Sequence, residues 1–184
     1  MPITPQEAQA VLDKADCLYT AEEVHEALDR LARQLTKRFH DSDPLVLCVM
    51  QGGLIPAGLL LPRLGFPLQQ DYIHATRYAG GTRGGQLEWV VRPSLPLRDR
   101  IVLIIDDIHD EGLTLDAIMR DCREAGAREV HSAVLVNKIH DRKHGLSADF
   151  SGLDVEDRYV FGFGMDYKGY LRNAAGIYAA NEDT

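Results

Sequence analysis

The sequence predicts an α/β fold with a mainly parallel central sheet. Short aliphatic runs alternate along the chain with segments of helical periodicity, an order typical of strands joined through helices. Residues 101–105, Ile-Val-Leu-Ile-Ile, contain no polar side chain, as expected of a strand that a parallel sheet buries on both faces. Two acids, Asp106 and Asp107, follow directly, at the end of a strand where such folds bind ligands.

The first forty residues are expected to form helices. Residues 4–7 and 20–23 both have the Thr-x-x-Glu pattern in which two side chains cap the start of a helix. From Val24 to Phe39, apolar residues recur at helical spacing, which predicts an amphipathic helix ending near residue 39. Residues 41–44, Asp-Ser-Asp-Pro, break that helix.

Strands and helices then alternate through the rest of the chain. Glycines make up most of residues 79–85 and separate two predicted strands. Gly126 marks the end of a predicted helix. The expected strands are 45–50, 68–78, 87–92, 100–105, 130–136 and 159–163, and the expected helices are 55–64 and 115–125.

Composition narrows the class of protein. A chain of 184 residues is long enough for one domain with a sizeable core. A formal net charge of -8 argues against non-specific binding to nucleic acid or to an anionic membrane. The three cysteines form no paired motif, Cys48 is expected in the core, and neither a signal sequence nor an apolar run of ~18 residues is present. We therefore expect a cytoplasmic protein.

The richest segment is 106–114. Adjacent carboxylates such as Asp106 and Asp107 can accept hydrogen bonds from a vicinal diol or bind a hard cation such as Mg²⁺. Residues 110–114, Asp-Glu-Gly-Leu-Thr, lead into a helix whose first N–H groups can bind a phosphate, with the Thr114 hydroxyl as a further donor. An isolated Asp-Asp pair is more often a solvated turn, but this position favours a ligand site.

This segment resembles the signature of type I phosphoribosyltransferases that binds 5-phosphoribosyl 1-pyrophosphate (PRPP). The loop Gln51-Gly52-Gly53 is similar to the pyrophosphate loop of that family, and residues 160–172 are similar to the C-terminal hood of its hypoxanthine-guanine members. The resemblance covers roughly residues 20–180. It implies one domain over residues 1–184: a core of helices around the sheet at about 21–149, a small hood from about 1–20 and 150–184, and a mobile lid at about 78–87.

The resemblance implies a role for each residue that contacts PRPP. Asp106 and Asp107 would hold the ribose hydroxyls and Mg²⁺, and Asp166 would reach a second metal site. Tyr78 would belong to the lid. The remaining PRPP contacts would come from Gln51, Gly52, Gly53, Asp110, Glu111, Gly112, Leu113, Thr114 and Arg172.

The resemblance also implies a purine site. Asp110 would act as general base at N7, and the Lys138 ammonium would donate to the exocyclic O6. Tyr159 would stack on the base, the Val160 carbonyl would face the 2-amino group of guanine, and Asp166 would lie beside them. Without the resemblance, Lys138 could equally be a solvated lysine at a strand end, Tyr159 a core residue and Arg172 a surface charge.

The implied activity is transfer of the 5-phosphoribosyl group from PRPP to N9 of hypoxanthine or guanine, with Mg²⁺, in a cytoplasmic homodimer or homotetramer. The implied products are IMP or GMP and pyrophosphate. Two alternatives stay open: an enzyme that prefers xanthine, and a regulator that binds PRPP on this fold without turnover. Neither nucleic acid nor membrane is an expected partner.

Several positions depart from the family pattern. Gln51 stands where many relatives have lysine, and Asp106 is one methylene shorter than the usual glutamate. Glu111 replaces a threonine or serine in the phosphate loop, which is unfavourable beside a phosphate unless the side chain points to solvent. Arg77 replaces a serine before the lid. We interpret His109, which lies between the acids, as an ordinary loop residue.

Overall fold

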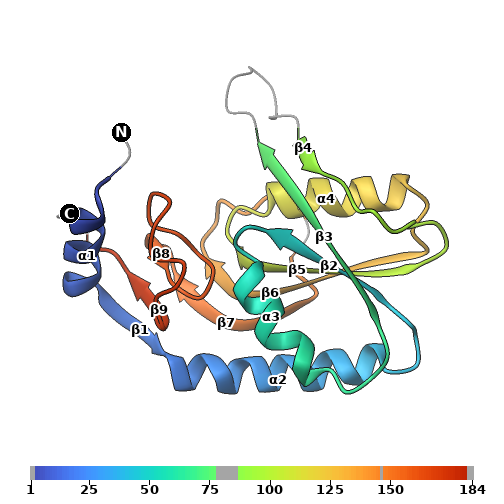
Figure 1. Cartoon of the computed structure of the whole chain (residues 1–184), viewed down its shortest axis with the longest axis horizontal. Coiled ribbons are helices and arrows are strands. Elements are labelled where there is room, and N and C mark those ends of the chain that lie inside the picture. The colour runs from blue at the N-terminus through green and yellow to red at the C-terminus, as the bar shows by residue number, and fades with distance from the viewer. Residues whose placement is uncertain (1–2, 78–86, 146, 182–184) are drawn as a thin grey trace.

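The computed structural model of the chain describes residues 3–77, 87–145 and 147–181. Within these ranges the chain forms two sheets with helices packed around them (Figure 1). The large sheet has six strands in the order β4-β3-β2-β5-β6-β7, and the small sheet has three in the order β1-β9-β8. This arrangement confirms the predicted α/β class.

The large sheet is mainly parallel, as predicted. Its strands are β2 (Leu45–Met50), β3 (Gln69–Arg77), β4 (Leu87–Val91), β5 (Ile101–His109), β6 (Glu129–Ile139) and β7 (Phe150–Glu156). All neighbouring pairs run parallel except β3 and β4, which are antiparallel. Parallel pairing places the carboxyl ends of β2, β5 and β6 along one edge of the sheet.

Helices cover both faces of the large sheet. On β2, Leu45 and Leu47 pack on the side of α4 (Leu113–Glu124), whereas Val46 and Cys48 pack on the side of α2 (Ala21–Phe39), because successive side chains of a strand point to opposite faces. The short α3 (Leu54–Leu60) and the 3-10 turn η1 (Leu61–Arg63) join the α2 side. In the described part of the chain, no helix combines the length and the apolar character that a bilayer crossing requires.

The small sheet joins the two ends of the chain (Figure 1). It consists of β1 (Asp16–Thr20), β8 (Val160–Phe161) and β9 (Gly176–Ala179), with α1 (Pro5–Lys14) beside it. Asp16 pairs with Ala179 across the two termini. The Tyr19 hydroxyl donates to the carbonyl of Asp154 at 2.7 Å, which ties the small sheet to β7 of the large one.

The structure corrects some predicted elements. The sequence did not indicate β1, β7 or β9. The strand β7 pairs with β6 in the large sheet, although the predicted hood began at residue 150. The strands β5 and β6 run on past residues 105 and 136 to His109 and Ile139, because their parallel pairing continues as far as His109 and Asn137 even where the side chains become polar.

Candidate active site

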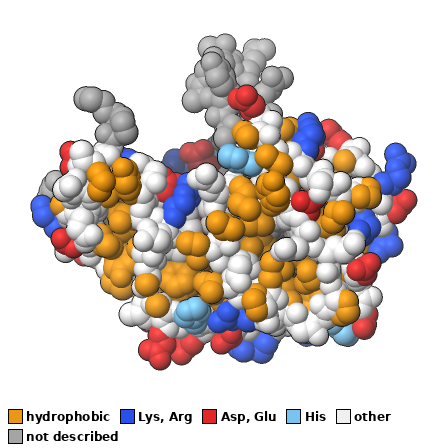
Figure 2. All heavy atoms as spheres, viewed as in Figure 1, with side chains coloured by type: hydrophobic (Ala, Val, Ile, Leu, Met, Phe, Trp, Pro, Cys, Tyr) orange, Lys and Arg blue, Asp and Glu red, His pale blue; other side chains and the backbone are white. Residues whose placement is uncertain are grey.

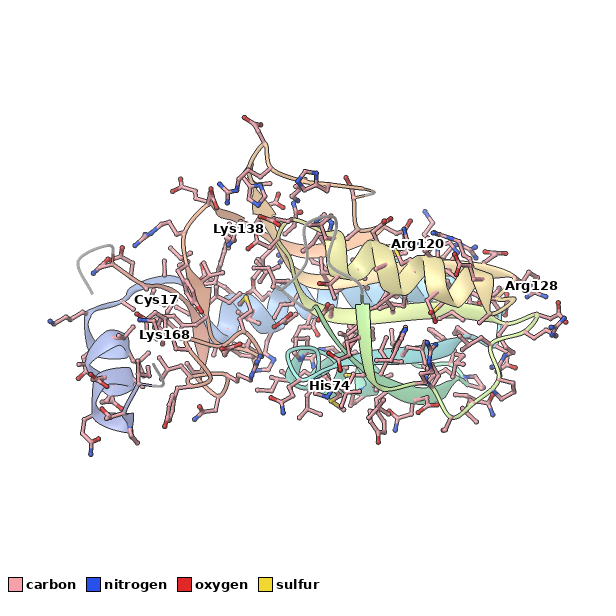
Figure 3. The ribbon with its side chains drawn as sticks, turned by 90° about the horizontal axis from the view of Figure 1, so that it is seen from above. Cys17, His74, Arg120, Arg128, Lys138 and Lys168 are labelled. Carbon is pink, nitrogen blue, oxygen red and sulfur yellow. The ribbon has the colours of Figure 1, made fainter. Side chains whose placement is uncertain are left out.

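Three segments that the sequence singled out converge on one edge of the large sheet. The loop 51–53 follows β2, and residues 106–114 span the end of β5 and the start of α4. Lys138 is the next-to-last residue of β6. In Figure 3, Lys138 lies on the side that faces the small sheet, and Arg128, at the other end of the large sheet, lies far from it. The site therefore sits between the two sheets.

The two adjacent carboxylates are held by backbone N–H groups. Asp107 N–H donates to Asp106 Oδ1 at 2.9 Å, and Ile108 N–H donates to Asp107 Oδ1 at 2.8 Å. Burial, and then the negative charge of Asp107, raise the pKa of Asp106 well above its ordinary value. Burial likewise raises the pKa of Asp107. Because burial and mutual repulsion disfavour two negative charges here, a bound cation or hydroxyl donors would stabilise the ionised pair.

The glycines of the loop 51–53 allow it to approach this pair. A Cβ atom on Gly52 would lie 2.0 Å from Asp107 Oδ2, and one on Gly53 would lie 2.7 Å from the Val49 carbonyl and 2.8 Å from that of Ile105. A side chain at Gly53 would displace the backbone of β2 or β5, and one at Gly52 would displace the Asp107 carboxylate. Gly52 and Gly53 thus allow close packing of this loop against β2 and the end of β5, and the Gly53 N–H donates to the Val49 carbonyl at 2.8 Å.

The predicted phosphate loop has the expected helix start. Gly112, with φ of 84°, immediately precedes α4, and Leu113 and Thr114 form the first turn of that helix. A Cβ atom on Gly112 would lie 2.6 Å from His109 Nε2 and 2.9 Å from the His144 carbonyl. The side chain of Glu111 is exposed, so the turn keeps its N–H groups free of a neighbouring buried carboxylate.

His109 is not an ordinary loop residue. Its side chain is buried at the end of β5, and Lys143 Nζ lies 3.1 Å from its Nδ1. Lys143 also contacts Asn137 Oδ1, and Asn137 Nδ2 donates to Asp154 Oδ1 at 2.7 Å. These contacts, together with the hydrogen bond from His144 N–H to the Glu111 carbonyl at 2.8 Å, support the phosphate loop from the segment after β6.

Asp110 lies between two nitrogen donors. Lys138 Nζ is 2.7 Å from Asp110 Oδ2, and His140 Nε2 is 2.7 Å from Asp110 Oδ1. Partial burial raises the pKa of Asp110, but the hydrogen bonds from Lys138 and His140 outweigh it and hold that pKa below the ordinary value. Asp110 is therefore a carboxylate at neutral pH, and it contacts Lys138, the other residue that the resemblance placed beside the purine.

The sequence did not single out His140. It follows Lys138 by two positions, and residues two apart in an extended segment point to the same side. That spacing, read beyond the predicted end of the strand, is the signal that could have indicated His140.

Lys138 and Tyr159 line a cavity of about 360 Å³ between the two sheets. Tyr159 is half exposed rather than part of the core, and its ring meets that of Tyr167 edge-on, with the ring centroids 5.1 Å apart. Val160, the next residue and the first of β8, is buried. The other residues around the cavity are Asp157, Arg158, Tyr167, Lys168, Ala180 and Asn181.

A second cavity, of about 420 Å³, is lined by two of the residues that the resemblance implied for pyrophosphate binding. Gln51 and Arg172 both line it, together with His74 of β3. Arg172 donates to the Gly164 carbonyl at 2.5 Å and pairs with Asp166 at 2.6 Å. Since Gln51 is neutral, Arg172 supplies the positive charge at this cavity.

Asp166 has partners of its own beside the site. Among the residues that the structure describes, no three His, Cys, Asp or Glu side chains come together as a metal site, and the second metal site that the resemblance implied for Asp166 stays a prediction. Asp166 accepts from Gly169 N–H at 2.7 Å and from Arg172. Tyr78 and the predicted lid, except residue 87, lie outside the described residues.

Comparisons with known proteins agree on one family. A family model described as a phosphoribosyl transferase domain matches residues 15–168. The chain is similar to the hypoxanthine-guanine phosphoribosyltransferase of Bacillus subtilis, with 31% identity over 85% of this chain and 87% of the relative. It is also similar to the hypoxanthine-guanine-xanthine phosphoribosyltransferase of Tritrichomonas foetus, with 29% identity over 85% and 86%.

Solved structures give the same result. A hypoxanthine phosphoribosyltransferase from Staphylococcus aureus superposes with a TM-score of 0.86 at 25% identity, covering 91% of this chain and 92% of that one. A hypoxanthine-guanine-xanthine phosphoribosyltransferase superposes with a TM-score of 0.82 at 27% identity, covering 91% and 97%.

Proposed function

The chain belongs to the phosphoribosyl transferase family, and from this premise we propose that it transfers the 5-phosphoribosyl group of PRPP to N9 of hypoxanthine or guanine. The products are IMP or GMP and pyrophosphate. The observation that carries the proposal is the position of Asp110, hydrogen-bonded to Lys138 where Lys138 lines a cavity of about 360 Å³.

The PRPP-binding residues follow from the edge of the large sheet. Asp106 and Asp107 accept hydrogen bonds from the ribose hydroxyls. The N–H groups of Gly112, Leu113 and Thr114 at the start of α4 bind the 5-phosphate, with Asp110 and Glu111 forming the entry to that turn. The loop Gln51-Gly52-Gly53 and Arg172 contact the pyrophosphate, with Arg172 supplying the positive charge.

The donor set around Asp106 and Asp107 fits Mg²⁺. This ion is usually bound through one or two carboxylates together with substrate phosphates and water, rather than by a cage of protein ligands. Two adjacent carboxylates whose pKa values are raised by burial match that pattern. Bound with PRPP, Mg²⁺ neutralises the pyrophosphate as leaving group. We assign Asp166 to the pairing and orientation of Arg172, from which it could reach a metal only through water.

The base site uses groups on both sheets. Lys138 donates to O6 of a 6-oxopurine, Tyr159 stacks on the ring, and the Val160 carbonyl faces the 2-amino group of guanine. As N9 forms its bond to C1 of the ribose, the bond from C1 to the pyrophosphate oxygen breaks and the N7 proton passes to Asp110. A positioned base of this kind contributes about 100- to 10,000-fold to rate.

We also propose that the chain acts as a single domain in a homodimer or homotetramer in the cytoplasm. Leu54 at the start of α3 and Tyr72 on β3 are exposed by about half, and Figure 2 shows hydrophobic side chains grouped over these two elements. Such a group of exposed side chains is typical of a contact surface. Sedimentation velocity tests this: a monomer at micromolar concentration would contradict it.

One assay tests the proposed function. Purified protein is mixed with PRPP and Mg²⁺, and pyrophosphate release is followed with hypoxanthine, guanine, xanthine, adenine and uracil in parallel. We expect release with hypoxanthine and guanine. Release chiefly with xanthine would favour the first alternative, and release with adenine alone would contradict the roles of Asp110 and Lys138. No release with any base, with PRPP still bound, would favour a regulator.

A further inference from the structure

His140 holds Asp110 from the side opposite to Lys138. It lies one residue beyond β6, its side chain is 4% exposed, and its Nε2 is 2.7 Å from Asp110 Oδ1. Lys138 Nζ is 2.7 Å from Oδ2 of the same carboxylate. Both oxygens of Asp110 are therefore engaged, each by a different residue.

The hydrogen bond at the second ring nitrogen of His140 shows which of the two nitrogens carries the proton. Arg142 N–H donates to His140 Nδ1 at 3.1 Å, so Nδ1 is the acceptor. A neutral imidazole has one donor and one acceptor nitrogen, which places the proton on Nε2, where it is donated to Asp110. A backbone N–H group thus fixes the direction of the hydrogen bond from His140 to the carboxylate.

We propose that His140 is a positioning residue that fixes the orientation of the Asp110 carboxylate for proton transfer from purine N7. The proposal rests on the proposed function. Lys138 has three N–H donors and shares them between Asp110 and the base cavity. The neutral His140 ring has a single N–H, which Asp110 accepts, and its other nitrogen accepts from Arg142 N–H, so its hold on Asp110 is not shared with the purine.

The charges around this group predict how its removal changes the pH dependence. Burial raises the pKa of Asp110, and Lys138 and His140 lower it. Loss of the His140 hydrogen bond removes one of the two lowering contacts, so the pKa of Asp110 rises. The other charged groups that act on this cluster are Arg142, Asp157 and Glu111.

Two substitutions at His140 separate positioning from packing. His140→Phe keeps the ring volume and removes the N–H, whereas His140→Gln places an amide N–H near the position of Nε2. We expect His140→Phe to lower kcat by about 10-fold, the value of one hydrogen bond to a charged group, with KM for PRPP within about 2-fold. We expect the acid limb of the kcat/KM profile to move to higher pH in His140→Phe and to return in His140→Gln.

His131→Phe is the matched control. His131 lies at the other end of β6 and contacts a carboxylate, that of Glu129, at 3.0 Å, so the same replacement there should leave the pH profile unchanged. An unchanged acid limb in His140→Phe would overturn the proposal. Equal loss in His140→Phe and His140→Gln would show a packing role and would also overturn it.

Nitrogen-15 NMR of histidine-labelled protein provides a readout that does not depend on turnover. We expect His140 to show a protonated Nε2 and an acceptor Nδ1 at neutral pH, and the Nε2 signal to shift in Asp110→Asn. The opposite tautomer, or no shift, would contradict the assignment. If the wild-type protein turned over no purine, the proposed function would fail, while this spectrum would still decide whether His140 holds Asp110.

Discussion

A cation, a histidine and a carboxylate come together near each end of β6, but the exposure of these side chains to solvent differs between the two ends. At the carboxyl end, Lys138 and His140 flank Asp110, and their side chains are 10% and 4% exposed. At the amino end, Arg38 and His131 flank Glu129, and their side chains are 40% and 21% exposed. In both places a carboxylate is held by a cation and a histidine, and its pKa is lowered.

Burial of the donors separates the two ends. Solvent competes with the hydrogen bonds at Glu129, and exposed ion pairs add little to stability. At Asp110 the two donors are 10% and 4% exposed while the carboxylate remains 43% exposed, so solvent reaches the acid but competes less for its partners. The two carboxylates are about equally exposed, so it is the burial of the cation and the histidine that distinguishes the group around Asp110.

The largest difference is expected from removing each carboxylate charge. Asp110→Asn should lower kcat by at least ~100-fold, because the N7 proton loses its acceptor, with PRPP affinity largely kept. Glu129→Gln should change kcat by less than about 2-fold. Steady-state pyrophosphate release and PRPP titration measure both. If Asp110→Asn retained full turnover, Asp110 would not be the base.

Replacing the cations should give the next largest difference. Lys138→Gln removes a charged donor to O6 and should lower kcat/KM for hypoxanthine by roughly 10- to 100-fold. Arg38→Gln should leave it unchanged. The ratio of kcat/KM for hypoxanthine to kcat/KM for adenine should fall only in Lys138→Gln. An equal loss for hypoxanthine and adenine would show that Lys138 does not read O6.

The stability effect should have the opposite sign at Asp107, where burial outweighs the charge of Arg172. The pKa of Asp107 is raised by burial, so wild-type stability falls as pH rises from the ordinary carboxyl pKa through the raised one. Asp107→Asn should therefore raise Tm without metal at pH 8 by roughly 3 °C, with no gain below about pH 3.9. Thermal melts at both pH values test the sign. A lower Tm at pH 8 would contradict the burial argument.

The smallest effect is expected at the exposed end of β6. Arg38→Gln removes an ion pair of 2.5 Å whose two side chains are each 40% exposed. Tm should fall by less than about 3 °C, since solvent screens such pairs, and turnover should not change. A thermal melt in low and high salt measures this. A larger loss that persisted in high salt would mean that the two ends of β6 are more alike than their exposure indicates.

How much the sequence predicts depends on how far apart the interacting residues lie. The strand β2 and the end of α2 have strong local patterns and were predicted correctly, whereas β5 and β6 were predicted only for their apolar parts and run on to His109 and Ile139. The strands β1 and β9 were not predicted, because their pairing joins Asp16 to Ala179 and neither strand has a pattern of its own.

The candidate site divides in the same way. The resemblance implied Asp110 at purine N7 and Lys138 at O6, and those roles stay predictions; the direct contact between the two side chains was not predicted. The role of His140 was not predicted either, since it depends on the turn after β6 and on a backbone N–H of Arg142. The pairing of Asp166 with Arg172 likewise depends on the local path of the chain, which residue types do not indicate.

The contact between Gly164 and Gly52 has a consequence for inhibitor design. A Cβ atom on Gly164 would lie 2.1 Å from the Gly52 carbonyl, so the small-sheet segment and the pyrophosphate loop meet backbone to backbone. Under the proposed function, a rigid inhibitor could join a purine analogue in the cavity at Lys138 to an acidic group in the cavity at Arg172. The protein segments between the two cavities are already packed against each other before such a molecule binds. Its affinity would not be reduced by the cost of ordering those segments. A resistance substitution at Gly164 would disrupt the same backbone contact and so would damage the enzyme itself.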